Sequence, residues 1–402
     1  MSHPISLSRR ATLKGAFGVV VASSLFPGPL RAQEGPIVLG TLTPLTGAGG
    51  PYGPIMREAA AAVVGEVNRV GGILGRQIKL VSEDDQTNPE AAIRAAHKLI
   101  DVDRVSAIIG TWASSVTSAV APLCWESKTF LTTVSGADSI TQLPHQGYVA
   151  RTQPNTALQG RKFADVALDL RAKKIQYMGP QTPFAQSIIT AITEATAPAG
   201  AVVTSMIYDG QKTSYRSEVD QAMRGKPDTI VMGGFAPDTT VLLKDIYRVG
   251  FKGNLVAFGF AVTPKLLDEL PAEATEGIYV VSPSPAIDSN AYRRLATLLN
   301  RSELDTYTCQ VYDQTSLVLL AIAAGGNASG TGIRDHLRRV SQGGGTKVGN
   351  ALDGLRLLAE KKKIDYDGAS GPCEFNEIGD ILDARFRFET IKSRKPTLIK
   401  IV

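Results

Sequence analysis

The sequence has few of the residues on which metal sites, disulfide frameworks and membrane spans depend. Its 402 residues include three cysteines, four histidines and two tryptophans, and aromatic residues make up 6% of the chain. The histidines are scattered, so they do not have the spacing of a metal ligand set. No run beyond residue 32 reaches the length of a membrane-spanning helix. The sequence therefore predicts a soluble chain with no metal and no membrane anchor.

The cysteines are Cys124, Cys309 and Cys373, and none lies directly after the N-terminal segment, so no lipid-anchored N-terminus is predicted. Cys124 falls in an apolar helical run and is typical of core packing. An oxidising compartment would allow one disulfide with one thiol left over. Cys309 and Cys373 are the favoured pair if a disulfide forms, although spacing alone does not decide it.

The first 32 residues have the pattern of an export signal. Arg9 and Arg10 precede the uncharged stretch Gly15–Phe26, and the small residue Ala32 follows as a cleavage site. This stretch is too short and too rich in small residues to span a bilayer. The pattern resembles a twin-arginine signal, with Thr12 where phenylalanine is usual, and the alternative is a disordered basic tail. The sequence thus predicts a protein exported to the periplasm and cleaved near Ala32.

The signal also contains most of the chain's excess positive charge. Arg9, Arg10, Lys14 and Arg31 lie in it with no acidic residue, whereas the whole chain has a formal net charge of +5. The remainder is therefore almost neutral. A nearly neutral chain has no basic surface for phosphates, so no nucleic-acid partner is predicted.

Short β-rich runs alternate with amphipathic helical runs through the rest of the chain. Ile37–Thr43 and Gln77–Glu83 are predicted strands, and the Ala-rich stretch Pro54–Arg69 between them is a predicted helix. The rhythm restarts after Arg151 with a helix over Asn155–Arg171. Such alternation indicates parallel sheets with helices on both faces, and two successive series indicate two lobes. The predicted fold class is therefore α/β, with two doubly wound lobes.

The loops after the strands are the places to look for a binding site, because parallel sheets bind ligands at the carboxyl ends of their strands. The loop Gly110–Thr117 offers hydroxyls and free backbone N–H groups at a helix start, which suit an anion, although plain helix capping explains them equally well. The next strand is followed by Thr133–Ser139, again small and polar. The glycine-rich loop Pro44–Gly53 lacks the glycine spacing of a dinucleotide loop.

Catalytic patterns are missing from the chain. It contains no Gly-x-Ser-x-Gly elbow and no zinc-ligand spacing. Glu83, Asp84 and Asp85 could in principle hold a metal, but acids that end a strand before a helix start explain this cluster more simply. The sequence therefore predicts a protein that is not an enzyme and uses no cofactor.

Several weak motifs occur in an order that identifies a family resemblance. They include Pro44–Gly47 with Tyr52-Gly53, Asn68-x-x-Gly71-Gly72, Asp84-Asp85 with Pro89, Arg151-Thr152 with Gln159-Gly160, and Asp313 after Tyr312. Together they resemble the branched-chain amino-acid type of periplasmic binding protein, from about Ile37 to the C-terminus. The resemblance implies a type I periplasmic-binding fold whose two lobes, joined by three hinge crossings, close on a ligand. The implied lobes are residues 36–154 with 283–362, and residues 155–282 with 363–402.

The resemblance also implies a function and a set of site residues. Proteins of this family deliver small ligands to the membrane permease of an ABC importer, and a monomer is expected. The loop after the third strand would hold the ligand carboxylate, the loop after the fourth would add a carbonyl and a hydroxyl, and aromatic rings would cover the ligand side chain. The implied residues are, in that order, Ser114 and Ser115; Ala137 and Ser139; and Tyr52, Phe184 and Phe235.

One departure from the family concerns the ligand's amine. Amino-acid binders have a carboxylate after the strand that here ends at Phe258, and this chain has Gly259–Val262, with Ala261 at the expected position. A buried ammonium without a partner costs several kcal/mol. We therefore expect a small carboxylate with an apolar or aromatic body. An apolar amino acid stays the second possibility, because Asp138 or Asp238 could supply the charge.

Two other functions are compatible with the chain. The same fold serves as a ligand-sensing domain for amides or amino acids, but such a sensor needs no export signal. Twin-arginine signals also accompany exported oxidoreductases, but this chain has none of the cofactor loops that they need.

Overall fold

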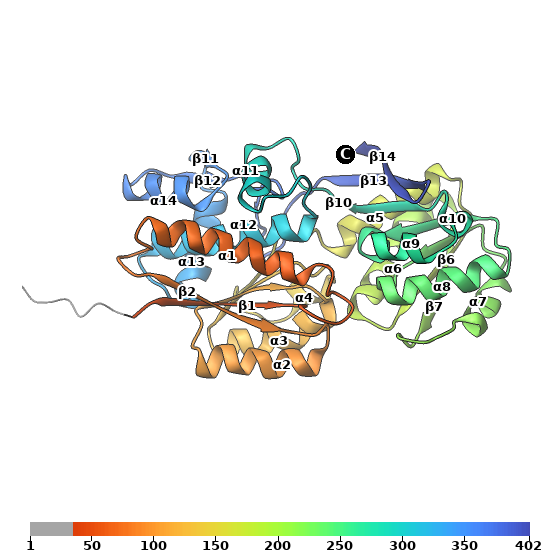
Figure 1. Cartoon of the computed structure of the whole chain (residues 1–402), viewed down its shortest axis with the longest axis horizontal. Coiled ribbons are helices and arrows are strands. Elements are labelled where there is room, and N and C mark those ends of the chain that lie inside the picture. The colour runs from red at the N-terminus through yellow and green to blue at the C-terminus, as the bar shows by residue number, and fades with distance from the viewer. Residues whose placement is uncertain (1–34) are drawn as a thin grey trace, which may run out of the picture. The chain divides into compact units, whose positions relative to one another are not determined.

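The computed structural model describes residues 35–402, and the predicted export signal lies outside the described residues. The described chain forms a five-stranded sheet, a seven-stranded sheet and a short two-stranded sheet. Helices cover both faces of each large sheet (Figure 1). We call the five-stranded sheet with its helices the first lobe, and the seven-stranded sheet with its helices the second lobe. The alternation of strands and helices predicted from the sequence is confirmed.

The five strands of the first sheet are parallel throughout. Helices α2 and α3 pack together on one face, and α1 packs with α12 on the other. The strands, in sheet order, are β2 (Ile78–Asp84), β1 (Ile37–Thr43), β3 (Ala107–Thr111), β4 (Phe130–Thr133) and β5 (Val149–Arg151). The helices are α1 (Gly53–Arg69), α2 (Pro89–His97), α3 (Ser114–Glu126), α4 (Ser139–Gln142), α11 (Asn290–Leu298), α12 (Thr306–Gly325), α13 (Gly330–Ser341) and α14 (Ala351–Ala359), with a π-helical turn at Lys98–Val102 and the small sheet of β11 (Thr346–Val348) and β12 (Ile364–Tyr366).

The seven-stranded sheet is parallel except for its last two strands. These strands pair antiparallel because they form a hairpin whose turn residues, Ser393 and Arg394, adopt the left-handed φ values of 49° and 63°. The strands, in sheet order, are β14 (Lys395–Ile401), β13 (Phe386–Lys392), β10 (Tyr279–Pro283), β9 (Asn254–Phe258), β8 (Thr229–Met232), β6 (Lys174–Pro180) and β7 (Val202–Tyr208). The helices are α5 (Thr156–Asp169), α6 (Pro183–Thr196), α7 (Arg216–Met223), α8 (Ala236–Arg248), α9 (Pro264–Glu269) and α10 (Ala272–Thr275), with 3-10 turns at Ala197–Ala199 and Gly259–Ala261.

The chain passes between the two lobes three times, as the family resemblance implied. It crosses after β5, after β10 and before β13. The residue bounds of the lobes stay a prediction, and packing favours one change to them. Tyr366, Cys373, Phe375 and Ile381 are buried in the core of the first lobe. This packing favours a last crossing near Ala384 rather than at residue 363.

The three cysteines are buried and free, so the disulfide considered for Cys309 and Cys373 is not formed. Within residues 35–402, no single helix has the length and apolar character of a membrane span. Helices α12 and α13 reach that composition only as a pair, with a bend of 102° between them.

Arg151 is the largest fully buried charged side chain of the described chain. Its Nε lies 2.7 Å from Oδ1 of Asp380, its Nη1 donates to the carbonyl of Ala137 at 2.6 Å, and its Nη2 donates to Thr141 at 3.0 Å. Asp380 also accepts a hydrogen bond from Asn155, which caps α5 of the second lobe. This ion pair therefore joins the loop after β4 to the first and last crossings.

Asp84 and Asp85 hold a turn that supports the glycine-rich loop. The turn contains Gln86 and Thr87, both with left-handed φ values, 55° and 54°. Asp84 Oδ1 accepts the Gln86 N–H at 2.8 Å, and Asp85 Oδ1 accepts the Thr87 N–H at 2.7 Å. Asp84 also accepts from the backbone and hydroxyl of Thr46, and the Thr87 hydroxyl accepts the N–H of Gly49. The cluster is therefore structural, as the sequence favoured.

The two aspartates have opposite pKa shifts. Burial, together with the neighbouring Asp84 charge, raises the pKa of Asp85 to about 7, although the hydrogen bond from the Thr87 N–H acts to lower it. Desolvation also acts to raise the pKa of Asp84, but its hydrogen bonds to Thr46, Gln86 and Leu45 together outweigh desolvation, so that pKa is lowered. Oδ2 of Asp85 is buried with no hydrogen-bond partner among the described residues, which makes its charged form costly.

We expect Arg151→Met to lower the free energy of unfolding by about 3–5 kcal/mol, because it leaves the Asp380 carboxylate buried without a counter-charge. Arg356→Met is the matched control, since Arg356 forms only an exposed pair with Glu360, worth at most about 1 kcal/mol. Urea unfolding of both variants measures the difference. Equal losses in the two variants would contradict the importance of the buried pair.

We expect Asp85→Asn to stabilise the protein above neutral pH. Between its ordinary pKa of 3.8 and about 7, Asp85 keeps its proton in the folded state and loses it in the unfolded state. Stability is therefore lost as pH rises through that window, by about 1.4 kcal/mol per pKa unit. Urea unfolding at pH 4.5, 6 and 8 should show the variant's advantage growing with pH.

Asp84→Asn is the control for this experiment. Because the Asp84 pKa is lowered, its stabilising contribution is fully present above its ordinary pKa and is lost only in acid. The difference in the free energy of unfolding between this variant and the wild-type protein should therefore stay constant from pH 5 to 8. A flat profile for Asp85→Asn as well would contradict the raised pKa.

Candidate functional site

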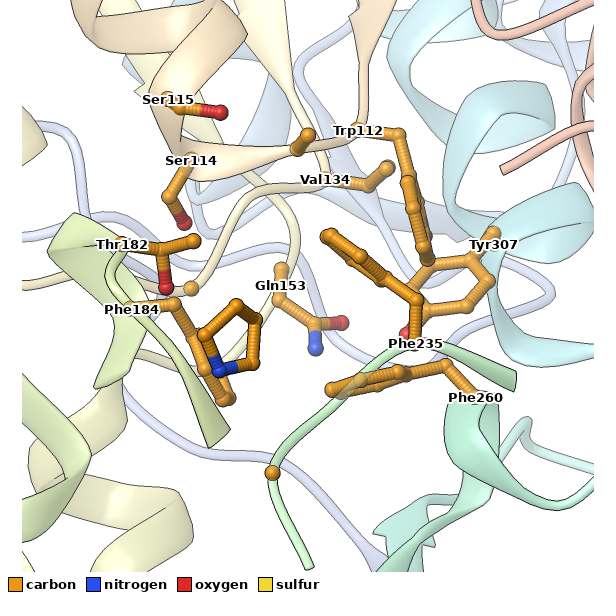
Figure 2. A pocket seen from close by; sticks show the side chains of 14 residues that line it. Trp112, Ser114, Ser115, Val134, Gln153, Thr182, Phe184, Phe235, Phe260 and Tyr307 are labelled. Carbon is orange, nitrogen blue, oxygen red and sulfur yellow. The ribbon is translucent and has the colours of Figure 1, made fainter. Parts of the chain in front are cut away.

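A cavity of about 510 Å³, part of it open to solvent, lies where the carboxyl ends of the two sheets meet (Figure 2). Apart from Pro180, the last residue of β6, and Tyr307 of α12, its lining residues follow a strand: β3, β4 or β5 in the first lobe, and β6, β8 or β9 in the second. Parallel sheets place ligands at this edge. The lining residues are Trp112, Ala113, Ser114, Ser115, Val134, Gly136, Gln153, Pro180, Thr182, Phe184, Gly233, Phe235, Phe260 and, from α12, Tyr307.

Helix α3 begins at the cavity without a side-chain cap. Its N-cap residue is Ala113, whose side chain cannot accept a hydrogen bond, and its first turn contains no acid. By contrast, α6 beside it is capped by the Thr182 hydroxyl, and the first turn of α8 contains Asp238. The N–H groups and partial positive charge at the start of α3 therefore face the cavity uncompensated by a side chain, which favours an anion there.

Ser114 is oriented to donate a hydrogen bond. Its Oγ accepts the backbone N–H of Ala137 at 3.2 Å, so its own proton is left for another acceptor. Behind it, the hydroxyls of Thr117, Thr133 and Ser135 hydrogen-bond to one another and tie the loop after β4 to α3. These bonds fix the two polar loops of the first lobe against each other.

Aromatic rings from both lobes form the apolar walls. Trp112 of the first lobe lies 5.4 Å from Phe235 and 6.0 Å from Phe260 of the second, measured between ring centroids. Phe184 lies 5.8 Å from Phe260. A side chain on Gly136 would come within 2.9 Å of the Phe184 ring, so the loop after β4 also touches the second lobe closely. The lobes thus meet through rings, in a closed arrangement.

Of the site residues implied by the family resemblance, Ser114, Ser115, Phe184 and Phe235 line the cavity. Tyr52 does not. It lies behind Trp112, with ring centroids 5.6 Å apart, and packs edge-on against Tyr307 at 5.2 Å. Trp112 therefore forms the wall at which Tyr52 was expected, and Tyr52 supports it. Burial raises the pKa of Tyr52, so its hydroxyl stays neutral.

Ala137 and Ser139 do not line the cavity either. The Ala137 side chain is fully buried, and its carbonyl, expected to hold the ligand, accepts a hydrogen bond from Arg151 at 2.6 Å. Ser139 is exposed and begins the short helix α4. The loop after β4 therefore supports Ser114 through the Ala137 N–H rather than by the expected carbonyl and hydroxyl.

No lining residue of the cavity, all of them within the described part of the chain, has a formal charge. Asp238, considered as a source of negative charge, instead accepts hydrogen bonds from Tyr215 and the Gln211 N–H. Asp138 accepts the N–H of Ala157. The two residues after Gly259 are also arranged differently from the expectation. Ala261 is buried in the core of the second lobe, and Phe260 faces the cavity.

Ten of the fourteen lining residues were not among the implied site residues. The five of them with an aromatic ring or a polar side chain are Trp112, Gln153, Thr182, Phe260 and Tyr307. Trp112 and Phe260 were detectable, because they lie in Gly110–Thr117 and Gly259–Val262, segments that follow predicted strands. Gln153 follows β5, a strand of three residues that is too short to recognise by pattern. Tyr307 comes from α12, and nothing in its local sequence indicates the cavity. No cluster of three or more potential metal ligands occurs within residues 35–402.

Comparison with known proteins gives a family for the chain. The sequence model of the periplasmic binding protein family matches residues 36–373. The substrate-binding protein of a chemotactic signal transduction system from Halobacterium salinarum is 26% identical, over 84% of this chain and 82% of its own length. A Leu/Ile/Val-binding protein from Rhizobium johnstonii is 24% identical, over 79% and 86%. Both are named as binding proteins rather than enzymes.

Solved structures share the fold at low identity. A leucine-binding protein from Thermotoga maritima superposes with a TM-score of 0.78 at 21% identity, covering 91% of this chain and 98% of its own. A branched-chain amino-acid binding protein from Streptococcus pneumoniae, in complex with isoleucine, gives 0.75 at 21% identity over 91% and 99%. A solute-binding protein from Rhodopseudomonas palustris, in complex with benzoate, gives 0.73 at 18% over 91% and 96%. These matches confirm the type I periplasmic-binding fold.

Proposed function

Because the chain belongs to the periplasmic binding protein family, we propose that it is the solute-binding component of an ABC importer. Its solute is a small carboxylate with an apolar or aromatic body, held between the two lobes. The protein works in the periplasm as a monomer and delivers the solute to a membrane permease. The observation that supports this most is the uncharged aromatic cavity at the uncapped start of α3.

The start of α3 supports a carboxylate as the ligand's polar end. A carboxylate there accepts hydrogen bonds from the Ser114 hydroxyl and the first N–H groups of the helix, and its charge is stabilised by the helix dipole. The Ser115 hydroxyl lies in the same turn. The first lobe thus forms the carboxylate subsite, and ligand bound there gains contacts with Phe184 and Phe235 as the lobes close.

The rest of the cavity supports an apolar ligand body without an ammonium group. Phe235, Phe260 and Trp112 surround it, and none of the cavity's lining residues, which all belong to the described chain, is acidic. An ammonium desolvated among these rings would have no carboxylate partner, and that costs several kcal/mol. The structural neighbours include both a benzoate complex and an isoleucine complex. The lining of this cavity favours the aromatic or aliphatic acid.

We expect Ser114→Ala to weaken the binding of benzoate or 4-methylpentanoate by about 10- to 100-fold, because a hydrogen bond to a charged group contributes about 1.5–3 kcal/mol. Ser118→Ala, on the same helix but outside the cavity lining, is the matched control. Isothermal titration calorimetry measures both. Unchanged affinity in Ser114→Ala, with unaltered thermal stability, would contradict the carboxylate subsite.

We expect Phe260→Glu to reverse the ligand preference. The wild-type protein should bind 4-methylpentanoate better than leucine, and the variant should bind leucine at least tenfold better than the wild-type protein does, because the introduced carboxylate pairs with the ammonium. Ala261→Glu is the control, since Ala261 lies in the core of the second lobe, and it should lose stability without gaining leucine. Tight leucine binding by the wild-type protein would instead support the amino-acid alternative.

The name of the Halobacterium relative supports a second candidate function, in which the bound protein presents its solute to a chemotaxis receptor. The same closed lobes would serve either partner. Uptake that is unimpaired in a deletion strain, together with lost chemotaxis to the solute, would favour this candidate over the importer.

A further inference from the structure

We propose that Gln153 recognises a second hydrogen-bonding group of the ligand, away from its carboxylate, and that Gln310 positions Gln153 for this task. This inference rests on the proposed function only in assuming that the ligand has a carboxylate at the start of α3. It narrows the ligand class to carboxylates whose apolar body has a hydrogen-bond acceptor, such as a ring hydroxyl, a carbonyl or an ether oxygen.

Gln153 is the single amide among the cavity's described lining residues, and it is only 4% exposed. Figure 2 shows its amide among the rings of Phe184, Phe235 and Phe260, apart from the hydroxyl of Ser114. The aromatic part of the cavity therefore contains an amide. Burial of that group without a partner is costly, so a ligand that satisfies it is favoured over one that does not.

The free atom of the Gln153 amide is its donor. Oε1 accepts a hydrogen bond from Nε2 of Gln310 at 2.7 Å. Nε2 of Gln153 makes no hydrogen bond to any residue that the structure describes. Because Gln310 presents its N–H at this contact, the oxygen of Gln153 faces Gln310 and the NH₂ group of Gln153 is left for the cavity. Oε1 of Gln310 is itself buried with no hydrogen-bond partner among the described residues. The cavity thus presents an N–H donor and selects an acceptor on the ligand.

Gln310 is itself held in the core. It is only 2% exposed on α12, and its Nε2 also lies 3.4 Å from the Thr306 hydroxyl. One helical turn along, Gln314 donates to the Thr152 hydroxyl at 2.9 Å and accepts from Thr132. Two glutamines spaced by four residues on α12 therefore anchor two successive residues of the first crossing. Only Gln310 reaches the residue that lines the cavity.

The place of Gln153 in the chain connects recognition with closure. It lies on the first crossing, between β5 of the first lobe and α5 of the second. Its partner Gln310 lines a separate cavity formed by the crossings, together with Pro154, Ser284 and Ala384. A ligand group bound to Gln153 is thus held by the connection between the lobes rather than by either lobe alone.

The test uses matched ligand pairs that differ by one acceptor. Benzoate is compared with 2-, 3- and 4-hydroxybenzoate, and pentanoate with 4-oxopentanoate, by calorimetry on the full mature chain. In the wild-type protein, at least one acceptor-bearing ligand should bind ten or more times tighter than its parent. In Gln153→Leu the ratio of the two affinities, acceptor-bearing ligand over parent, should fall to about one, while the affinity for the parent stays unchanged or rises. No ratio above two in the wild-type protein would overturn the proposal.

Two further variants separate positioning from packing. Gln310→Met should reduce the ratio, since it removes the donor that orients Gln153. Gln314 anchors Thr152 rather than Gln153. Gln314→Met should therefore leave the affinity ratio unchanged even if it lowers the free energy of unfolding. If folded Gln153→Leu kept the wild-type affinity ratio between the acceptor-bearing ligand and its parent, the role of Gln153 would be wrong. If Gln310→Met and Gln314→Met changed that ratio equally, the positioning role of Gln310 would be wrong.

An uncharged pair distinguishes failure of this inference from failure of the proposed function. Benzyl alcohol and 4-hydroxybenzyl alcohol have no carboxylate. If no carboxylate binds but this pair shows a ratio that depends on Gln153, the carboxylate subsite is wrong and the Gln153 role stands. If carboxylates bind with an affinity that depends on Ser114 and no ligand pair responds to Gln153→Leu, the carboxylate subsite stands and the Gln153 role is wrong. Binding of none of these ligands would count against both.

Discussion

The candidate site depends on one buried charge. A fully buried guanidinium must be neutralised and hydrogen-bonded, because an uncompensated charge in the interior costs several kcal/mol. Arg151 meets this need with the Asp380 carboxylate and the Ala137 carbonyl. Its position is therefore fixed relative to the loop after β4 and to two of the three crossings. Ala137 in turn donates to Ser114, so the ion pair indirectly sets the hydroxyl of the proposed carboxylate subsite.

The second constraint is the separation of the cavity's polar end, at the start of α3, from its apolar walls, to which both lobes contribute rings. The first lobe contributes the uncapped start of α3 with Ser114, and the second contributes Phe184, Phe235 and Phe260. A carboxylate end can be desolvated only where donors replace water, whereas an apolar body is favoured wherever rings exclude it. Together the lobes suit a ligand with one polar end, and Gln153 adds a single donor on the crossing between them.

The fold was largely predictable from the sequence. The buried strand Ile37–Thr43 was predicted at its observed bounds, because a short apolar and β-branched run is a local property of the sequence. Short elements were missed: β5 and β12 have three residues each, too few to show a period. The antiparallel pairing of β13 with β10 was not predicted, because the direction of that pairing depends on a partner distant in the chain.

For the site, local patterns in the sequence indicated which loops could bind a ligand, since loops after parallel strands meet at one edge of a sheet. The family resemblance implied Ser114, Ser115, Phe184 and Phe235 as site residues, and these four line the cavity. The tertiary structure decided which side chain of each loop faces that cavity. Trp112 lines the cavity where Tyr52 was expected, and Phe260 faces it where Ala261 was expected. The Ala137 carbonyl accepts a hydrogen bond from Arg151 and does not line the cavity. Tyr307 and Gln310 entered from a helix more than 150 residues from Gln153, which only packing could bring there. Sequence patterns indicate which segment lies at the edge of a sheet. The direction of each side chain, and which of its donors and acceptors stay free, depend on neighbours that come together only in the folded chain.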